Sequence, residues 1–272
     1  MSTSLYLVDY HLHTPLCGHA RGEIDDYLVE AVKKGLVEIG FCDHLPLYFL
    51  PPGQSIPGYA MDEDQLPLYV EKVLALRERS PIPVKLGIEA DYAPGREREL
   101  ALLLSGYPFD YVTGSIHFID GWSFDHPGEI GEYSRRDLNE VYERYFSLLV
   151  EASQSGLFDV MAHPDLIKKF GFVPKRDLRP LYEETARAFK RADVCAEINT
   201  AGLRYPAKEI YPARPLLEAF YAHGVPVTLG SDAHAPLQVG EAVEKALALA
   251  VEVGYRELAV FERRARKMVK IS

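Results

Sequence analysis

The sequence predicts an α/β protein built as a barrel of seven βα units. Short apolar segments alternate with longer amphipathic segments from one end of the 272-residue chain to the other, and this alternation is typical of repeated βα units around a parallel sheet. Polar residues of the kinds that bind metals follow each apolar segment, as functional residues do at the carboxyl ends of barrel strands. No segment has the composition of a linker, so we expect a single domain over residues 1–272.

The predicted strands are short apolar runs, and the predicted helices carry apolar residues at a helical period. In chain order, the strands are expected at residues 5–10, 37–42, 84–90, 109–115, 158–162, 194–198 and 225–229. Helices are expected at residues 24–34, 63–79, 135–155, 178–192, 213–223 and 239–253, with a last helix from residue 257 towards the C-terminus.

Two segments of the chain carry more specific local signals. The helix at 135–155 is expected to begin after a capping hydroxyl at Ser134, to have Asp137 in its first turn, and to end before Gly156. The stretch 45–61 contains four prolines and three aromatic residues and has no clear period. It is therefore expected to form a long loop over the site.

The charge and the cysteine content argue against several classes of protein. The net charge of -10 and the isoelectric point of about 5.4 leave no broad basic surface, so we expect no nucleic-acid partner. The three cysteines form no Cys-x-x-Cys pair, which argues against a disulfide framework and a zinc ribbon. The N-terminal segment lacks signal-peptide features, and no run approaches the roughly 18 apolar residues of a membrane helix. We therefore expect a cytoplasmic protein without a membrane partner, and its oligomeric state stays open, a homo-oligomer included.

Every predicted strand ends in polar residues. His11 and His13 follow the first strand, and their spacing places both rings on one side of an extended backbone, about 6.5 Å apart along the strand. Two rings placed in this way can share one ion. At the other strand ends stand Asp43 and His44, Glu89 and Asp91, Ser115 and His117, His163 and Asp165, Glu197 and Asn199, and Asp232 and His234.

The histidines are concentrated at these positions. Seven of the nine lie at strand ends or, as His19 does, in the loop after the first strand, and a packing role would have to explain that placement seven times. The other two, His126 and His223, fit an ordinary packing or surface role. Imidazoles beside carboxylates indicate a hydrolytic site for zinc, manganese or iron, with Glu89 as the natural bridge between two ions.

The motifs at the strand ends resemble those of a known family. In order, they read DYHLHT with CGHA, FCDH, GIEADY, GSIHF with GWSFD, AHPDLIKKFG, EINTAGLRYPAKEIYP and GSDAH. Over nearly the whole chain they resemble the polymerase and histidinol phosphatase superfamily, and within it the histidinol-phosphate phosphatases. The resemblance implies a distorted seven-stranded barrel that holds two to three divalent ions. The implied ligands are His11, His13, Glu89 and Asp232 for one ion, Glu89, His117 and His163 for a second, and His19, His44 and His234 for a third.

The resemblance also implies a reaction. A hydroxide that bridges two ions would attack the phosphorus of histidinol phosphate in line, and the ions would stabilise the leaving alkoxide. Glu89 would be catalytic as the bridge, and Asp232, Asp43 and a histidine of the cluster compete for the role of the acid that protonates the alkoxide. Asp9 and Asp43 have the alternative role of orienting imidazoles from behind.

Candidates for binding the substrate follow from charge and from position near the strand ends. Arg204 and Lys168, with Arg21 behind them, are candidates for the phosphate. Candidates for the amino group and imidazole of histidinol are Glu197, Asp165, Tyr92, Phe118 and Trp122.

Cys17, between two of the histidines, is expected to pack as a small residue of its loop rather than to bind a metal.

Three other functions remain open alternatives. A barrel of this kind could hydrolyse nucleotides or short oligonucleotides, although the acidic charge and the GWSFD and NTAGLR stretches argue against it. An amidohydrolase also begins with His-x-His, but it normally has eight βα units and often a bridging lysine after the fourth strand, where this chain has Ser115 and His117. A metal-binding barrel without catalysis would keep a costly set of buried polar groups that have no chemical task.

Overall fold

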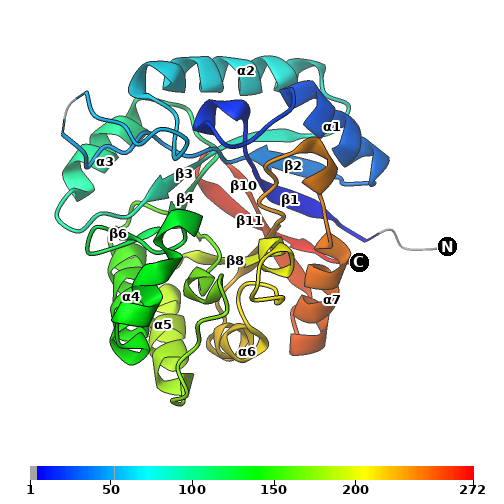
Figure 1. Ribbon diagram of the computed structural model, residues 1–272. Coiled ribbons are helices and arrows are strands. Elements are labelled where there is room, and N and C mark those ends of the chain that lie inside the picture. The colour runs from blue at the N-terminus through cyan, green and yellow to red at the C-terminus, as the bar shows by residue number, and fades with distance from the viewer. Residues whose placement is uncertain (1–4, 52) are drawn as a thin grey trace.

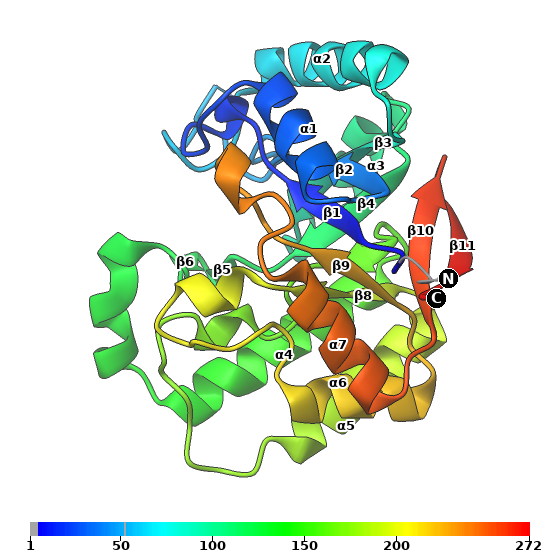
Figure 2. The same cartoon turned by 90° about the vertical axis from the view of Figure 1, so that its right-hand side faces the viewer.

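A computed structural model describes residues 5–51 and 53–272 of the protein. Seven parallel strands form one sheet in the order β1-β2-β3-β4-β7-β8-β9, with helices around it (Figures 1 and 2). The first and last of these strands meet through a parallel bridge between Leu12 and Ala233, so the sheet is a nearly closed barrel, as predicted. The strands are β1 (Val8–Leu12), β2 (Glu38–Phe41), β3 (Val84–Asp91), β4 (Tyr111–Ser115), β7 (Val160–Met161), β8 (Cys195–Asn199) and β9 (Val227–Gly230).

Most of the helices outside the barrel lie close to their predicted positions. α3 (Glu97–Ser105) is not among the predicted helices, because it is only nine residues long and no side chain caps its start at Arg96. In the part of the chain that the structure describes, no helix is long and apolar enough to cross a membrane. The other helices are α1 (Ile24–Lys33), α2 (Leu66–Arg79), α4 (Leu138–Gln154), α5 (Arg179–Ala192), α6 (Arg214–His223) and α7 (Val243–Val253).

Helix α4 begins later than predicted. Its N-cap is Asp137, whose carboxylate accepts a hydrogen bond from the amide of Asn139 at 2.7 Å. Ser134 belongs instead to a 3-10 helix at Pro127–Arg135 that comes before α4. A carboxylate at this position satisfies a free amide and also interacts favourably with the helix dipole, which a hydroxyl does not. The predicted end of the helix is confirmed, since Gly156 follows it with a φ of +73°.

The C-terminal segment is a β-hairpin, so the predicted helix from residue 257 is wrong. β10 (Glu257–Glu262) and β11 (Ala265–Lys270) pair antiparallel. The two residues between them, Arg263 and Arg264, have φ values of +49° and +66°. This left-handed conformation is what a tight hairpin turn requires, but glycine and asparagine usually supply it, so the sequence carries no clear signal for the turn.

The hairpin covers the amino ends of the barrel strands, at the opposite end from the cavity described below (Figure 2). Phe261 packs edge-on against Tyr10 of β1, with ring centroids 5.9 Å apart. It also packs against Tyr111 of β4 at 5.8 Å. Beside the turn, the backbone amide of Arg264 donates to the carbonyl of Asp110 at 2.8 Å. These contacts with the barrel, rather than local propensity, select the strand conformation.

The ring of Tyr111 fills space inside the barrel. Its hydroxyl donates to the carbonyl of Tyr10 at 2.6 Å. The neighbouring strands approach the ring with Gly40 and Gly87, where a Cβ atom would lie 2.2 Å from the Tyr111 side chain. Because so short a contact is impossible, both positions require glycine.

Replacing Gly87 with alanine is expected to destabilise the protein by about 2–3 kcal/mol, because the added methyl group overpacks a filled interior. For a chain of this size, that loss corresponds to a fall in melting temperature of about 5–10 °C. The control is Gly131→Ala, since a Cβ at Gly131 meets no atom within 4 Å. Thermal unfolding of the two variants checks the prediction, and equal melting temperatures would contradict it.

Candidate metal centre

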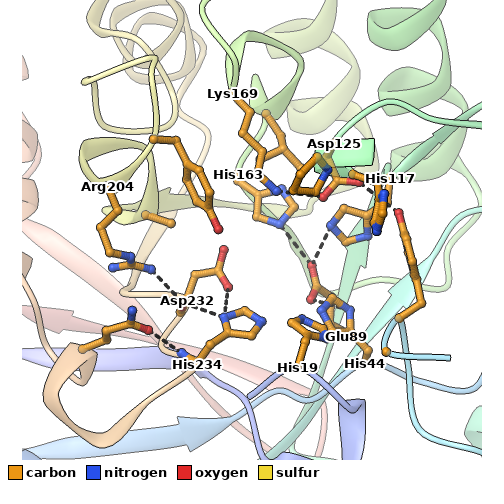
Figure 3. Close-up of a pocket in the computed structure, with 18 residues that line it drawn as sticks. His19, His44, Glu89, His117, Asp125, His163, Lys169, Arg204, Asp232 and His234 are labelled. Atoms are coloured by element: carbon orange, nitrogen blue, oxygen red, sulfur yellow. Dashed lines mark hydrogen bonds and ion pairs between the residues drawn. The ribbon is translucent and has the colours of Figure 1, made fainter. Parts of the chain in front are cut away.

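The nine residues predicted as ligands converge at the carboxyl ends of the barrel strands. Seven of them line a cavity of about 350 Å³ (Figure 3). His11 and His13 are fully buried behind those seven. The residues of the set that line the cavity are His19, His44, Glu89, His117, His163, Asp232 and His234.

Glu89 lies at the centre of this group. Its Oε2 is 3.2 Å from Nε2 of His11 and 3.1 Å from Nδ1 of His44. Its Oε1 is 3.1 Å from Nε2 of His163 and 3.7 Å from Nε2 of His117. Burial opposes the charged carboxylate, but His44 and His11 hold the pKa of Glu89 well below its usual value. Each oxygen of an ionised Glu89 thus faces its own pair of imidazoles, which is the arrangement of a carboxylate able to bridge two cations.

A second set of contacts surrounds Asp232. Its Oδ1 is 3.1 Å from Nε2 of His13 and 3.3 Å from Nδ1 of His234. The rings of His13 and His234 stack with centroids 4.0 Å apart, and the ring of His19 stacks on His234 at 4.5 Å. Burial opposes ionisation here too, but His11 and His13 hold the pKa of Asp232 well below its usual value. Asp232 therefore joins the His11 and His13 side of the cluster to the side that contains His19.

The donor atoms of this cluster fit divalent metals. Nδ1 of His163 and Nε2 of His234 are buried and have no hydrogen-bond partner, and Nε2 of His13 makes no hydrogen bond although Oδ1 of Asp232 lies 3.1 Å away. A bound cation would relieve this costly state. Burial lowers the pKa of His44 and His234 well below the usual value, which favours the neutral form of the ring that binds metals. Groups whose ligand atoms lie within 4.8 Å of one another include His11, His13 and Glu89; His44, Glu89 and His117; and His19, His44 and His234.

Carboxylates behind the imidazoles orient three of the rings. Nδ1 of His11 lies 2.6 Å from Oε1 of Glu197, and Nδ1 of His117 lies 3.0 Å from Oδ1 of Asp91. Nδ1 of His13 lies 3.4 Å from Oδ1 of Asp43. A carboxylate on one ring nitrogen fixes the tautomer and directs the other nitrogen towards the metal position. The sequence could have indicated this role of Asp91, because Asp91 stands two residues after Glu89 and therefore lies on the same face of β3.

Replacing Asp91 with asparagine is expected to weaken metal binding about 10- to 100-fold. The amide oxygen can still accept from the backbone amide of His117, as Oδ1 of Asp91 does at 3.0 Å, so the change removes mainly the charge behind the ring. Competition with a coloured chelator measures the effect. The matched control is Asp177→Asn, in an exposed pair with Arg179, and an unchanged affinity in the Asp91 variant would refute the orienting role.

The surroundings of Asp43 favour the orienting role over that of a proton donor. Asp43 is fully buried and does not line the cavity. Its carboxylate accepts hydrogen bonds from the backbone amide and hydroxyl of Thr14 and from the amide of His44. Asp9, the other acid considered for orienting a ring, accepts instead from the backbone amides of Ser231 and Gly240, both at 2.8 Å.

One wall of the cavity carries charged and aromatic groups that sequence reasoning missed. Nζ of Lys169 is 3.1 Å from Oδ2 of Asp125 and lies 4.6 Å from the ring centroid of Tyr205. The hydroxyl of Tyr59 donates to Oδ1 of Asp125 at 2.9 Å. Burial opposes the charge on Asp125, but Lys169 and His117 lower its pKa to about 2. The ion pair therefore stays charged at neutral pH, beside the metal cluster (Figure 3).

A comparison with known families identifies the protein's family. The sequence matches the PHP domain family over residues 9–201, which is most of the chain. This protein belongs to the PHP domain family.

Similar proteins cover nearly the whole chain. A probable histidinol-phosphatase of Deinococcus radiodurans is 40% identical over 266 residues, which cover 95% of this chain and 98% of that protein. The histidinol-phosphatase of Bacillus subtilis is 29% identical and covers 87% of this chain and 96% of its own. Among solved structures, the histidinol phosphate phosphatase of Lactococcus lactis, complexed with zinc, L-histidinol and phosphate, superposes with a TM-score of 0.83 at 25% identity. That match covers 97% of this chain and 100% of the other.

Two of the predicted substrate residues have other roles in this PHP domain. Lys168 does not line the cavity; its ammonium is 2.8 Å from Asp165 and 2.7 Å from Glu209. Lys168 ends a short 3-10 helix, Leu166–Lys168, and the next lysine, Lys169, faces the cavity instead. Glu197, predicted to bind the substrate, is enclosed behind the ring of His11 and has 2% of its side chain exposed.

Trp122 and Arg21 also lie away from the cavity. The ring of Trp122 is buried against Tyr133, with centroids 4.8 Å apart, and the guanidinium of Arg136 lies 4.5 Å from its centroid. The side chain of Arg21 is exposed and does not line the cavity. Neither placement could be predicted from the sequence, because Trp122 stands in the short strand β6 (Trp122–Ser123) and Arg21 in a loop, and the path of both segments depends on distant contacts.

Arg204 is the predicted substrate residue that does line the cavity. Its Nη2 donates to the carbonyls of Ser231 and Asp232, both at 2.8 Å, and Nη1 donates to Glu241 at 3.2 Å. These bonds hold the guanidinium beside the backbone that carries Asp232. The wall of the cavity therefore carries a fixed positive charge at Arg204 and a second one at Lys169 (Figure 3).

The loop at residues 45–61 reaches the cavity, as predicted. Gly58 and Tyr59 line it, together with His126, which had been expected to play an ordinary packing or surface role. The rings of Tyr59 and His126 stack with centroids 6.3 Å apart. Pro52, within the predicted loop, lies outside the described residues.

Proposed function

We propose that this PHP domain is a metal-dependent phosphomonoesterase that hydrolyses L-histidinol phosphate to L-histidinol and phosphate, in histidine biosynthesis. The observation that carries the proposal is the cluster of seven imidazoles around Glu89 and Asp232 at the floor of a cavity with cationic walls. The similarity to proteins named as histidinol-phosphatases supports the choice of substrate.

We propose three ion positions, two of which share Glu89, with zinc as the first metal to test, since the Lactococcus lactis protein was solved with zinc. Manganese and iron suit the same donors. When bound, such ions supply positive charge for the phosphoryl oxygens and lower the pKa of the attacking water. The proposed groups are His11, His13, Glu89 and Asp232; Glu89, His117 and His163; and His19, His44 and His234.

The residues of the chain then have separate tasks. Glu89 would be a ligand of two ions, since its two oxygens face different imidazoles. Arg204 and Lys169, which both line the cavity, attract the phosphate and reduce its negative charge. Asp232 lines the cavity and is ionised, so it can accept a proton from the attacking water and deliver it to the leaving alkoxide. Asp43, enclosed behind His13, is not accessible for that transfer.

The cavity also offers groups for the other end of histidinol phosphate. Its amino group is a cation, and the ionised carboxylate of Asp125 lines the cavity beside the metal cluster. The stacked rings of Tyr59 and His126 can pack against an imidazole. A substrate with an anion at one end and a cationic, aromatic group at the other therefore matches the charges of the cavity.

A panel of phosphate monoesters tests the substrate. Phosphate release from histidinol phosphate should exceed release from nucleoside monophosphates by about a hundredfold in kcat/KM, since the nucleotides leave the charged wall unpaired. Equal or faster release from nucleotides would favour the alternative that the protein hydrolyses nucleotides or short oligonucleotides. Failure to release phosphate from histidinol phosphate, with zinc, manganese and iron each restored, would reject the proposal.

A further inference from the structure

Cys17 lies against the metal cluster but has no place in the ligand groups above. It ends a short 3-10 helix, Pro15–Cys17, in the loop after β1, and its side chain is fully buried. Its Sγ is 3.9 Å from Nε2 of His19. The ligand atoms of Cys17, His13 and His234 all lie within 4.8 Å of one another. The sulfur therefore lies within the range of a shared ion.

A tight turn holds Cys17 in this position. The turn depends on Gly18, whose φ is +83°, and the amide of Gly18 donates to the carbonyl of Pro15 at 3.0 Å. The buried sulfur is therefore held beside the ring of His19.

The neighbouring imidazoles supply an independent sign of a missing cation. Nε2 of His234 is buried without a hydrogen-bond partner, and Nε2 of the fully buried His13 makes no hydrogen bond although Oδ1 of Asp232 lies 3.1 Å away. Both residues belong to the same group as Cys17. A tetrahedral zinc ion with bonds of about 2.1 Å to nitrogen and 2.3 Å to sulfur separates the two ligand atoms by about 3.6 Å. The distance of 3.9 Å between Sγ of Cys17 and Nε2 of His19 is close to that separation.

We propose that Cys17 is a sulfur ligand of the ion held by His19 and His234. On binding, the S–H bond breaks, the proton passes to solvent, and a bond forms between sulfur and the metal, without oxidation or reduction. The other cysteines are engaged elsewhere: Sγ of Cys42 donates to Oγ1 of Thr113 at 3.3 Å, and Sγ of Cys195 contacts the carbonyl of Ala196 at 3.6 Å. The inference rests on the metal binding in the proposed function but not on its substrate.

A sulfur ligand would make this position different from the other two. Thiolate favours zinc over manganese, and it donates more charge to the ion than imidazole does. The ion beside Cys17 is therefore the one that selects zinc. We expect Cys17→Ser to lower the preference for zinc over manganese at this position by about tenfold or more.

Cobalt(II) substitution tests the ligand directly, by a readout that does not depend on activity. A thiolate bound to cobalt(II) absorbs in the near ultraviolet through charge transfer, whereas imidazole and carboxylate ligands give only the weaker visible bands. We expect that absorption in the cobalt-loaded wild-type protein. It should disappear in Cys17→Ser and persist in the matched control Cys195→Ser, with the visible bands retained in both.

The outcomes separate this inference from the proposed function. A fully cobalt-loaded wild-type protein without the near-ultraviolet absorption would overturn the sulfur ligand, even if the Cys17 variant failed to fold. Absorption that persisted in Cys17→Ser would overturn it as well. The absorption could appear in the wild-type protein and disappear in Cys17→Ser while the wild-type protein fails to hydrolyse histidinol phosphate. That outcome would support the sulfur ligand and reject the proposed substrate.

Discussion

Replacing Glu89 with glutamine is expected to lower kcat by about a thousandfold, equivalent to about 4 kcal/mol of transition-state stabilisation. The amide keeps the shape of the side chain, but it removes the negative charge that four imidazoles surround within 3.7 Å. Without that charge, the two oxygens cannot hold two cations close together, and both lose affinity. Steady-state hydrolysis of histidinol phosphate, with metal content determined by elemental analysis, measures the effect.

The matched control for Glu89→Gln is Glu218→Gln. Glu218 is exposed on α6 and pairs with Arg214 at 2.8 Å, so its loss should change neither the metal content nor the rate. The far-ultraviolet circular dichroism of both variants should equal that of the wild-type protein. A Glu89→Gln protein that kept more than about a tenth of wild-type kcat at full metal content would be incompatible with a bridging carboxylate.

Removing the metals with a chelator is expected to abolish hydrolysis reversibly and to leave the barrel folded. The barrel is held by its seven-stranded sheet and by a core that extends well beyond the cluster, so the secondary structure does not depend on the ions. Binding at about a thousandfold above Kd stabilises a folded protein by about 4 kcal/mol. Chelation should therefore lower the melting temperature by about 10 °C.

Readdition of zinc, manganese or iron to the stripped protein should restore turnover. The turnover regained with each metal ranks the three metals. Calorimetry and circular dichroism on the stripped sample separate a catalytic centre from a purely structural one. Loss of the secondary structure on chelation would indicate that the metals hold the fold. Full turnover in a sample shown to be metal-free would contradict metal dependence.

The strands and the ligand cluster could be predicted from the sequence for a common physical reason. A buried parallel strand must be a short apolar run, and the carboxyl ends of such strands meet at one mouth. The sequence therefore predicts that residues such as His117 and His163 come together, although they are far apart in the chain. This prediction does not require knowledge of their contacts. Asp125 could not be predicted in this way, because it does not stand at the end of a barrel strand. It follows a small hairpin formed by β5 (Phe118–Ile119) and β6 (Trp122–Ser123).

Contacts between distant residues decide the features that the sequence could not predict. Whether the carboxylate of Glu197 faces the cavity or the back of His11 depends on how β1 and β8 lie across the barrel. The choice between Lys168 and Lys169 depends on the direction of one turn of 3-10 helix. The segment from residue 257 contains residues that suit either a helix or a strand, and the barrel end to which Phe261 binds decides between them.

The hairpin also has a consequence for the order in which a newly made chain can fold. The amide of Tyr6, before β1, donates to the carbonyl of Ile271 at 3.0 Å, and the amide of Phe261 donates to the hydroxyl of Tyr10 at 3.1 Å. β1 can pair with β2 early, but it meets its other neighbours only after β9 and the hairpin have left the ribosome. The metal cluster can therefore assemble only after Asp232 and His234, which follow β9, have been made.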